Sequence, residues 1–350
     1  MDVWEKLKQT NKPIVLYGMG NGADKILSVF GARGIEARGV FASDGFVRAG
    51  KTFHGFPVRG YADTVAEFGD VCVVVAFASA LPDVVANVER IAAERELYVP
   101  DVPVAGGGLF DSAFYGEHRD ELAEVRNMLA DERSRRVFDL VCEAKLTGDP
   151  DALTASADDE EEFGYGLLKP EKYTAYADLG AYTGDTLRAA CAVAPSLARA
   201  WAFEPDRRSF AKLRACADTL PFEVECVQAA AWSRSGATLT FADGEGRGSA
   251  VTASDHAHAV VSAALDDVVR DAHVDFIKFD VEGAESEAIR GARRVISHCQ
   301  PDVRCAIYHR PEDLFAIPRA LRELLPDHRF FVRRARSFPA WDVDLFAVGG

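Results

Sequence analysis

The sequence predicts an α/β protein with two units, a smaller Rossmann-like unit and a larger unit with seven strands. Three observations lead to this prediction. Short apolar strands alternate with helices in both halves of the 350-residue chain. A glycine-rich turn follows the first strand of each half, at 18–20 and at 180–184. The last two strands are joined by the short link 337–340, so they should form an antiparallel edge on a mostly parallel sheet.

The first half begins with a charged, helical segment at 1–10. Apolar and periodic runs then predict strands and helices in alternation. The strands are expected at 14–17, 35–41 and 71–77. A helix is expected after the turn at 18–23 through about residue 30, and further helices at 62–68 and 82–94. We therefore assign residues 1–110 to a Rossmann-like accessory domain.

A second segment, 111–172, is expected to connect the two units. Residues 111–146 contain few helix breakers and are predicted to be helical. Residues 147–162 are polar and acidic, with five acids in succession at 158–162, and are interpreted as a linker or mobile flap.

The third segment, 173–350, resumes the strand–helix alternation. Its strands are expected at 175–179, 199–203, 222–228, 274–280, 303–309, 328–334 and 342–348. Residues 237–252 interrupt this order and are interpreted as an inserted β-hairpin. Ser249 in this hairpin is a candidate contact to a substrate hydroxyl. The arginines at 333–336 are typical of a solvated strand edge.

The composition limits the partners. The formal net charge of −15 argues against nucleic acid as a partner. The longest apolar run, 71–78, is far too short to span a bilayer. The seven cysteines are scattered and form no C-x-x-C pair, which fits a reducing compartment. We expect a cytoplasmic protein with neither nucleic acid nor a membrane span, and we allow for a homodimer.

A strand, a glycine turn and a helix start at 176–186 indicate a nucleoside site. Gly180 and Gly184 let the backbone approach a ligand closely. Tyr182 stands where a pyrophosphate site has its middle glycine, so a cofactor without phosphate beside this turn is favoured over NAD. Glu204 ends the next strand, 20 residues after Gly184. A carboxylate there can accept hydrogen bonds from both ribose hydroxyls.

A dense group of acids follows the strand expected at 274–280. Lys278 and Asp280 are two residues apart on a strand, so they share a face and could form an ion pair. Asp280 lies at the strand end, where it could touch the substrate. Glu282 is a second candidate contact, whereas Glu285 is expected to begin the next helix, where the helix dipole favours an acid.

His309 ends the strand expected at 303–309, beside the same crevice. Its ordinary pKa suits a base near neutral pH, although a histidine at a strand end is more often a structural hydrogen-bonding group. With Asp280 and Glu282 it could bind a divalent cation, but the sequence does not decide this and we assign no metal. His256 and His258 form an isolated H-x-H pair that we interpret as part of a surface loop.

In these motifs the chain resembles the FkbM family of S-adenosylmethionine-dependent methyltransferases over about residues 173–310. The segments that carry the resemblance are Asp178-Leu179-Gly180-Ala181-Tyr182-Thr183-Gly184-Asp185-Thr186, Phe203-Glu204-Pro205, Ala229-Ala230-Ala231-Trp232, Leu265-Asp266-Asp267 and Ile277-Lys278-Phe279-Asp280-Val281-Glu282-Gly283-Ala284-Glu285. The resemblance implies a class I methyltransferase fold and methylation of hydroxyls on sugars, polysaccharides or polyketides. Where the family often ends its fifth strand with an acid and a histidine, this chain has Ala306-Ile307-Tyr308-His309.

The resemblance also implies a site for S-adenosyl-L-methionine. The turn at 180–184 would line the methionine end, and Glu204 would hold the ribose. Residues 230–232 would lie near the adenine. The residues expected to bind the cofactor are Asp178, Gly180, Tyr182, Thr183, Gly184, Asp185, Thr186, Glu204, Asp206, Ala230, Ala231 and Trp232.

The sequence therefore predicts an S-adenosylmethionine-dependent O-methyltransferase. Its acceptor would be a hydroxyl of a sugar, polysaccharide or glycosylated metabolite. Asp280 is expected to face the transferred methyl group, because an alcohol nucleophile gains from a base that removes its proton during attack. The candidate catalytic residues are Asp280, Glu282, His309 and Lys278.

The first half offers an alternative function. Gly18-x-Gly20-x-x-Ala23 fits the dinucleotide fingerprint, and Asp44 follows at about the right distance. The segment 53–58 resembles the N-terminal nucleotide-fold domains of some sugar-modifying acyltransferases. The protein would then be an NAD(P)-linked oxidoreductase or a nucleotide-sugar-binding protein. In the main interpretation these glycines make only a tight turn in an accessory domain, and a third alternative is a binding module that kept the fold without catalysis.

Overall fold

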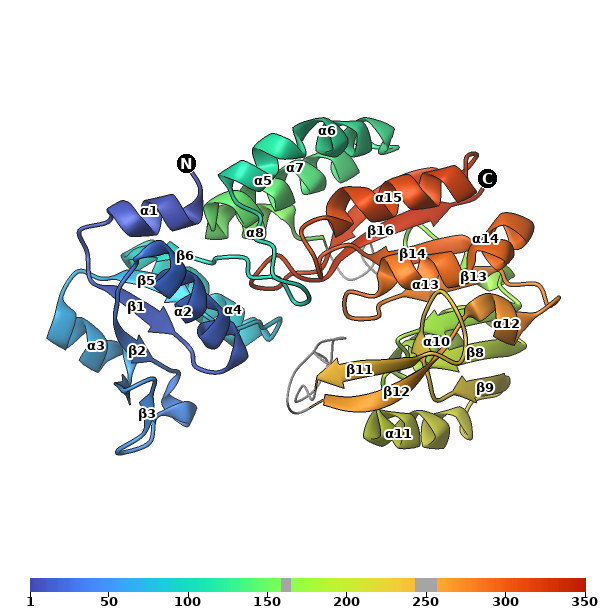
Figure 1. Ribbon diagram of the computed structural model, residues 1–350, viewed down its shortest axis with the longest axis horizontal. Coiled ribbons are helices and arrows are strands. Elements are labelled where there is room, and N and C mark those ends of the chain that lie inside the picture. Colours follow the sequence, from blue (N-terminus) through green and yellow to red (C-terminus); the bar gives the residue numbers. More distant parts are fainter. Residues whose placement is uncertain (159–164, 243–256) are drawn as a thin grey trace.

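The computed structural model describes residues 1–158, 165–242 and 257–350, and it consists of two α/β units joined by a group of helices (Figure 1). Three features discussed above lie outside the described residues: the acids at 159–162, the expected hairpin turn and Ser249. Within the described residues no helix is long and apolar enough to cross a bilayer.

The N-terminal unit is built on a six-stranded sheet with the order β3-β4-β2-β1-β5-β6. Its strands are β1 (Ile14–Tyr17), β2 (Ala37–Phe41), β3 (Thr52–Phe53), β4 (Phe56–Arg59), β5 (Cys72–Val75) and β6 (Glu96–Tyr98). The helices are α1 (Val3–Gln9), α2 (Asn21–Arg33), α3 (Tyr61–Phe68) and α4 (Pro82–Glu94), with a short 3-10 turn η1 (Asp44–Phe46). The sequence did not predict β3, β4 and β6, since strands of two to four residues carry little periodicity.

The connecting helices are α5 (Ser112–Glu117), α6 (Arg119–Met128), α7 (Glu132–Thr147) and α8 (Pro150–Ser156). The interpretation of 147–162 as a linker or flap is wrong over α8. Asp149 caps this helix by accepting a hydrogen bond from the Asp151 backbone N–H, and Pro150 occupies its first turn. The helix buries Ala152 and Leu153. The capping residue and the apolar face therefore favour a helix here despite the acidic composition of the segment.

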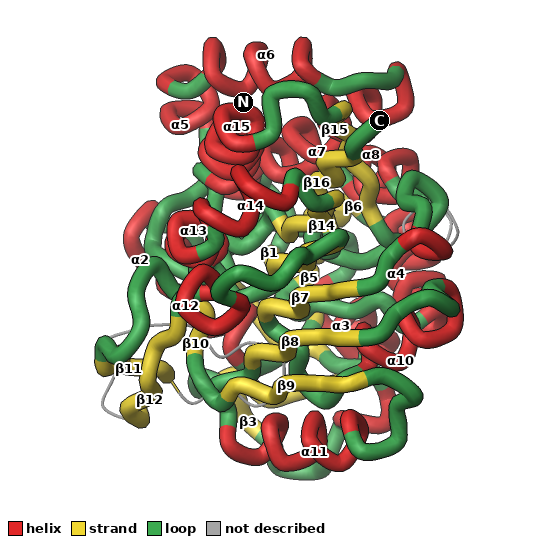
Figure 2. The backbone as a smooth tube through the Cα atoms, turned by 90° about the vertical axis from the view of Figure 1, so that its right-hand side faces the viewer, coloured by secondary structure: helices red, strands yellow, loops and turns green. Residues whose placement is uncertain are grey.

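The C-terminal unit is built on a seven-stranded sheet with the order β15-β16-β14-β13-β7-β8-β9, seen in succession in Figure 2. Its strands are β7 (Ala175–Leu179), β8 (Arg199–Phe203), β9 (Glu223–Val227), β13 (Phe276–Phe279), β14 (Asp302–Ala306), β15 (Arg329–Arg334) and β16 (Val343–Val348). β16 is antiparallel to both β14 and β15, as the short link between the last two strands predicts. The predicted fold class is therefore confirmed.

Helices cover both faces of this sheet (Figure 2). They are α10 (Asp185–Val193), α11 (Arg207–Ala217), α12 (Leu265–Val269), α13 (Glu285–Gly291), α14 (Arg293–Cys299) and α15 (Asp313–Leu324), and a 3-10 turn, η2 (Pro170–Lys172), precedes β7. Successive strand residues point to opposite faces. Ala177 and Leu179 therefore pack in the core beneath α13 and α14, whereas Tyr176 packs in the core beneath α10. Both cores are buried, which fixes the strand register and with it the positions of the strand ends.

A small three-stranded sheet is inserted after β9. It consists of β10 (Ala230–Ala231), β11 (Thr238–Ala242) and β12 (Ala257–Ala263). The expected hairpin exists, since β11 pairs antiparallel with β12, whose residues are 257–263. The strand expected at 249–252 lies outside the described residues. The interpretation of 256–258 as a loop is wrong for residues 257 and 258, which begin β12.

The carboxyl ends of the two large sheets face one another. Ser79, just beyond β5, forms two backbone hydrogen bonds with Phe338, N to O 2.8 Å and 3.0 Å. Phe338 precedes β16, and the start of β16 lies beside the end of β14, where the Ile307 N–H donates to the Val343 carbonyl. In open α/β sheets these edges bear the ligand sites. The two glycine turns therefore lie at edges that face one another.

The arginines at the end of β15 do not form a solvated strand edge. Arg334 is fully buried, and its guanidinium donates to the carbonyls of Leu153, Ser337 and Pro339. It ties α8 to the link between the last two strands. The expectation of a solvated edge is wrong for Arg333 and Arg334, because helix α8, which the sequence did not predict, covers this edge. Arg336 is exposed, as expected.

Replacing Arg334 by methionine should lower the free energy of unfolding by about 3 kcal/mol or more, because several buried carbonyls would lose their donor. Arg336→Met is the matched control, since Arg336 is exposed and pairs with Glu89 on the surface. We expect the control to cost about 1 kcal/mol or less. Urea unfolding of both variants measures the difference, and equal losses would contradict this account of Arg334.

Candidate active site

The first glycine turn of the C-terminal unit joins β7 to α10. Gly180 has φ 93°, and a Cβ atom there would lie 1.8 Å from the Asp280 carbonyl oxygen. Glycine is therefore required, and the end of β13 is held directly against the turn. Thr186 in α10 donates a hydrogen bond to the carboxylate of Asp178, which is fully buried.

A buried lysine connects this turn to the acids after β13. Lys278 and Asp178 are register partners on the adjacent strands β13 and β7. The Lys278 Nζ lies 3.4 Å from Asp178 Oδ1, 3.4 Å from Asp280 Oδ2 and 3.2 Å from the Gly180 carbonyl. The expected ion pair between Lys278 and Asp280 is present, and the lysine holds two acids rather than one.

The charge states follow from this arrangement. Burial lowers the pKa of Lys278, but Asp178 and Asp280 outweigh burial and raise that pKa above its ordinary value. Burial raises the pKa of Asp280, but Lys278 and then His309 outweigh it and hold that pKa below its ordinary value. Asp280 is thus an ionised carboxylate at neutral pH, and its side chain is 38% exposed at the sheet edge.

The second half of the turn lies beside Glu204, the acid expected to bind the ribose. Tyr182 and Gly184 have φ 47° and 83°, and the space of a Gly184 Cβ is taken by Cys216, 2.7 Å from its Sγ. Glu204 is 7% exposed and accepts a hydrogen bond from the Asp206 N–H at 2.8 Å. Burial raises the pKa of Glu204 to about 7, although the backbone donors of Asp206 and Tyr182 oppose this shift.

The other residues expected at the cofactor have identifiable structural positions. Asp206 caps α11 by accepting from the N–H groups of Arg208 and Ser209. Asp185 is the first residue of α10, and Thr183 lies in the turn before it. Ala230 and Ala231 are buried in β10 and are followed by Trp232, whose N–H donates to the Ala263 carbonyl.

His309 lies at the centre of a cluster formed with three acids, Asp280, Glu282 and Glu285, which we call the acidic cluster. The His309 Nδ1 lies 2.9 Å from Glu285 Oε1, and its Nε2 lies 3.7 Å from Asp280 Oδ1 and 3.6 Å from Glu282 Oε2. The sequence predicts that His309 ends a strand, but β14 ends at Ala306 and His309 lies three residues beyond it. The bend toward the acids occurs in these three residues.

Burial lowers the pKa of His309, but Glu285, Glu282 and Asp280 outweigh burial and raise it to about 10. Burial and the neighbouring acids raise the pKa of Glu282 to about 8, against the opposing effect of His309. In the protein alone, His309 therefore holds both of its protons at neutral pH. The expectation that His309 acts as a free base is not supported by this environment.

Glu285 begins α13, as expected, and it also holds the preceding turn. Its Oε1 accepts hydrogen bonds from the Val281 N–H at 2.8 Å and from His309. Glu282 has φ 55°, an unusual conformation for a residue with a side chain. The turn is thus folded around the Glu285 carboxylate, which directs Glu282 toward His309.

The segment between the two units completes this site. A Cβ on Gly283 would lie 2.3 Å from the Ala105 Cβ, and the Ala105 N–H donates to the His309 carbonyl at 3.1 Å. Arg310 Nε donates to the Gly283 carbonyl at 2.8 Å. Lys25 in α2 holds the same segment by donating to the carbonyls of residues 103 and 104. These contacts could not be predicted from the sequence, because they join parts of the chain that are far apart.

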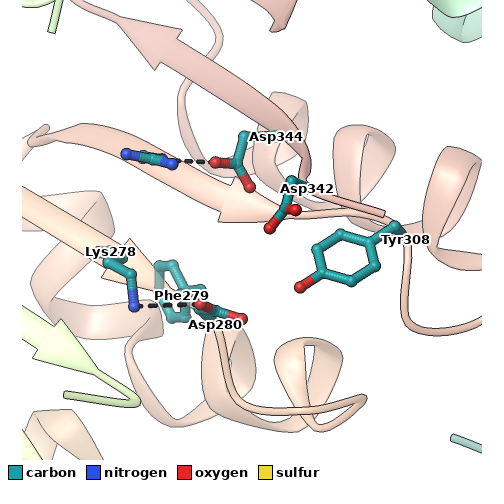
Figure 3. A pocket seen from close by; sticks show the side chains of 7 residues that line it. Lys278, Phe279, Asp280, Tyr308, Asp342 and Asp344 are labelled. Carbon is teal, nitrogen blue, oxygen red and sulfur yellow. Dashed lines mark hydrogen bonds and ion pairs between the residues drawn. The ribbon is translucent and has the colours of Figure 1, made fainter. Parts of the chain in front are cut away.

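A cavity of about 30 Å³, roughly the space of one water molecule, lies beside Asp280 (Figure 3). The side chains of Asp280, Tyr308, Asp342 and Asp344 are directed toward it. Its lining is completed by Lys278, Phe279 and Arg304. The Tyr308 hydroxyl and these carboxylates form a polar wall next to the acidic cluster, which the sequence analysis did not identify.

In the N-terminal unit the three glycines of the other turn differ in their surroundings. The space of a Gly18 Cβ is taken by the Phe77 ring at 2.5 Å, and that of a Gly22 Cβ by the Ala76 carbonyl oxygen at 2.6 Å. No atom of the described residues lies within 4 Å of a Gly20 Cβ. Gly18 and Gly22 thus serve packing, while Gly20 faces open space.

The strand order, with an antiparallel strand next to the edge, defines the class I methyltransferase fold. The same fold occurs over both units in the crystal structure of a methyltransferase FkbM from Methylobacillus flagellatus, with a TM-score of 0.72 and 20% identity, covering 99% of this chain and 93% of that one. Residues 178–333 match the family model of the Methyltransferase FkbM domain. This part of the chain is an FkbM methyltransferase domain, which confirms the family expected from the motifs.

Other solved structures are similar over part of the chain. Aeropyrum pernix fibrillarin, in complex with natively bound S-adenosyl-L-methionine, has a TM-score of 0.34 and 15% identity, with 52% of this chain and 69% of that chain covered. The SAH-bound methyltransferase PaMTH1 of Podospora anserina has a TM-score of 0.30 and 10% identity, with 70% and 100% covered. No curated protein sequence matches the chain. The weak structural similarities add no argument about this site.

Replacing Lys278 by methionine should lower the free energy of unfolding by about 3–5 kcal/mol, because Asp178 would remain as a buried charge without its partner. Urea unfolding checks this loss. Adding Asp178→Asn to the variant removes the uncompensated charge and should recover part of the stability. A loss for Lys278→Met below about 1 kcal/mol would show that the buried ion pair is not needed.

Proposed function

We propose that the protein is an S-adenosylmethionine-dependent O-methyltransferase acting on a hydroxyl of a sugar, polysaccharide or glycosylated metabolite. The observation that carries this proposal is the contact between Asp280 and Gly180. The Asp280 carbonyl fills the space of a Gly180 side chain, so an ionised, partly exposed carboxylate lies next to the turn expected at the methionine end. A base candidate and the cofactor turn are thereby adjacent.

The residues present fit S-adenosyl-L-methionine, the cofactor of this class. Glu204 is a buried carboxylate at the end of β8, beside the backbone of Tyr182, where it can accept both ribose hydroxyls. Residues 180–184 would line the methionine end, and 230–232 would lie near the adenine. The cofactor supplies an activated methyl group on a sulfonium.

The chain itself would position the acceptor and take up its proton. An alcohol nucleophile gains from a base within hydrogen-bond reach during attack. Asp280 is ionised at neutral pH and partly exposed, so it can accept a hydrogen bond from the attacking hydroxyl. Lys278 fixes Asp280 from behind, and Glu282 offers a second contact from the same edge. Positioning alone contributes much of the catalysis in such a displacement.

The polar wall favours a polyhydroxylated acceptor. The Tyr308 hydroxyl can donate and accept hydrogen bonds, and the carboxylates of Asp280, Asp342 and Asp344 can accept them. These groups are directed toward one small space (Figure 3), where they could bind a single hydroxyl of such an acceptor.

The test combines cofactor binding with product analysis. Calorimetry with S-adenosylhomocysteine should detect binding to the wild type, and Glu204→Ala should abolish it. The wild type, incubated with isotope-labelled S-adenosylmethionine and a panel of saccharides and glycosylated metabolites, should form methyl ethers identified by mass spectrometry. Label found only on amines, or cofactor binding that Glu204→Ala leaves unchanged, would exclude the proposal.

The N-terminal turn supports a second candidate function, binding of a dinucleotide or a nucleotide sugar, with NAD(P)-linked oxidoreduction as its catalytic form. The supporting observation is the open space at Gly20, at the start of α2, where a phosphate can approach the backbone. Calorimetry with NAD(H) and with nucleotide sugars tests it. Binding that Gly20→Val abolishes would support this candidate, and absence of binding would exclude it.

Affinity for S-adenosylhomocysteine should rise with pH between 6 and 8. The pKa of Glu204 is about 7, and the protonated carboxyl cannot accept hydrogen bonds from both ribose hydroxyls. If only the ionised form binds, affinity should increase about tenfold over this range. Calorimetry at several pH values measures the effect. Glu204→Gln should bind weakly and without this dependence, and a flat profile in the wild type would argue against a ribose contact by Glu204.

Asp280→Asn should lower kcat by about 10²–10⁴-fold while changing the affinity for S-adenosylhomocysteine little, because a neutral amide cannot take up the proton of the acceptor. Steady-state kinetics and calorimetry separate the two effects. Glu312→Gln is a control, since Glu312 is an exposed acid beside Arg310. Unchanged kcat in Asp280→Asn would remove Asp280 from the catalytic residues.

A further inference from the structure

The acidic cluster contains a buried nitrogen that lies near two carboxylates but forms no hydrogen bond among the described residues. His309 is fully buried, and its Nε2 forms no hydrogen bond with any of the residues that the structure describes. The nitrogen is nevertheless directed at Asp280 and Glu282, whose carboxylate oxygens lie 3.7 Å and 3.6 Å away, beyond hydrogen-bond distance. A buried polar atom in this state is costly unless something binds it.

The spacing of these atoms fits a metal ion. Nitrogen and oxygen ligands lie about 2.0–2.2 Å from ions such as Zn²⁺, which places neighbouring ligands of a tetrahedral site about 3.4 Å apart. The separations of 3.6 and 3.7 Å from Nε2 to the two carboxylate oxygens are close to this value.

The other side of the imidazole is arranged as in a metal-bound histidine. His309 Nδ1 lies 2.9 Å from Glu285 Oε1, and both side chains are fully buried. Histidine ligands commonly donate their second N–H to a carboxylate, which fixes the ring and its tautomer. This contact directs Nε2 toward Asp280 and Glu282.

The charges also favour a cation. Three carboxylates surround His309, and Lys278 is shared between Asp280 and Asp178. The Asp280 and Glu282 side chains are 38% and 23% exposed, so an ion held between them would keep coordination positions open toward the sheet edge. Carboxylate ligands favour Mg²⁺ and Mn²⁺, and imidazole favours Zn²⁺ and Fe²⁺.

We propose that His309 Nε2 and the carboxylates of Asp280 and Glu282 bind a divalent transition-metal cation such as Zn²⁺ or Mn²⁺, with Glu285 as the residue that positions His309. This inference revises the expectation of no metal. Its functional part rests on the proposed methyl transfer: the open positions of the ion would hold and orient the oxygen of the acceptor hydroxyl.

The experiment measures binding of Mn²⁺ to the full chain by electron paramagnetic resonance of the free ion, with Zn²⁺ and Mg²⁺ as competitors. We expect one Mn²⁺ per chain in the wild type. His309→Ala and Glu282→Gln should each weaken binding at least tenfold, and Glu285→Gln should weaken it about 10–100-fold. His273→Ala is the matched control, because His273 is an exposed histidine that also contacts an acid, Asp275; its affinity should equal that of the wild type.

Absence of Mn²⁺ binding to the wild type at millimolar concentration, or equal binding in His309→Ala and the wild type, would overturn the proposal. If circular dichroism shows that His309→Ala does not fold, the Mn²⁺ affinity of Glu282→Gln tests the proposal, because Glu282 is partly exposed. Binding of S-adenosylhomocysteine and methyl transfer are measured separately, with and without a chelator. Methyl transfer that persists without Mn²⁺ binding would refute the metal and leave the proposed function intact.

Discussion

The buried ion pairs of Lys278 are the interaction on which the rest of the site depends. The lysine reaches Asp178 on the neighbouring strand, Asp280 beyond its own strand and the carbonyl of Gly180. It therefore links β7 to β13 and also holds the glycine turn at 180–184 against the end of β13. Because Asp178 and the lysine are desolvated together, neither can be removed without leaving an uncompensated charge. A single side chain thus couples the stability of the sheet to the geometry of its carboxyl edge.

Much of this unit could be predicted from local sequence. The turn at 180–184 follows from its glycines, Glu204 from its distance to them, and the pairing of Lys278 with Asp280 from the period of a strand. The helix start at Glu285 follows from the helix dipole. The pairing of Lys278 with Asp178 could not be predicted in the same way, since it depends on which strands become neighbours. Likewise, the sequence identified His309 as a candidate but could not show that three acids surround it and change its charge.

The errors have a common cause. Helix α8, the cover over Arg334 and the second strand of the hairpin all depend on contacts between distant parts of the chain. Composition suggested a solvated linker at 147–162 and a solvated edge at 333–336, whereas Asp158 accepts from the backbone N–H of Arg334 and both residues are buried. The segment around Ala105 is a further example. Its residues are small and apolar, and nothing in them predicts that they would lie against Gly283 and His309.

The position of that segment affects how such proteins can be divided or recombined. Ala105 belongs to the chain before the connecting helices, yet it lies against the turn that holds Glu282. A fragment that begins at β7 would contain the whole FkbM domain match and still lack one wall of its own site. Exchange of the N-terminal unit between relatives would likewise have to preserve the residues near 105 and 283 as a matched pair. The candidate site therefore extends beyond the family domain. We expect the segment near 105 and the turn near 283 to change together in evolution.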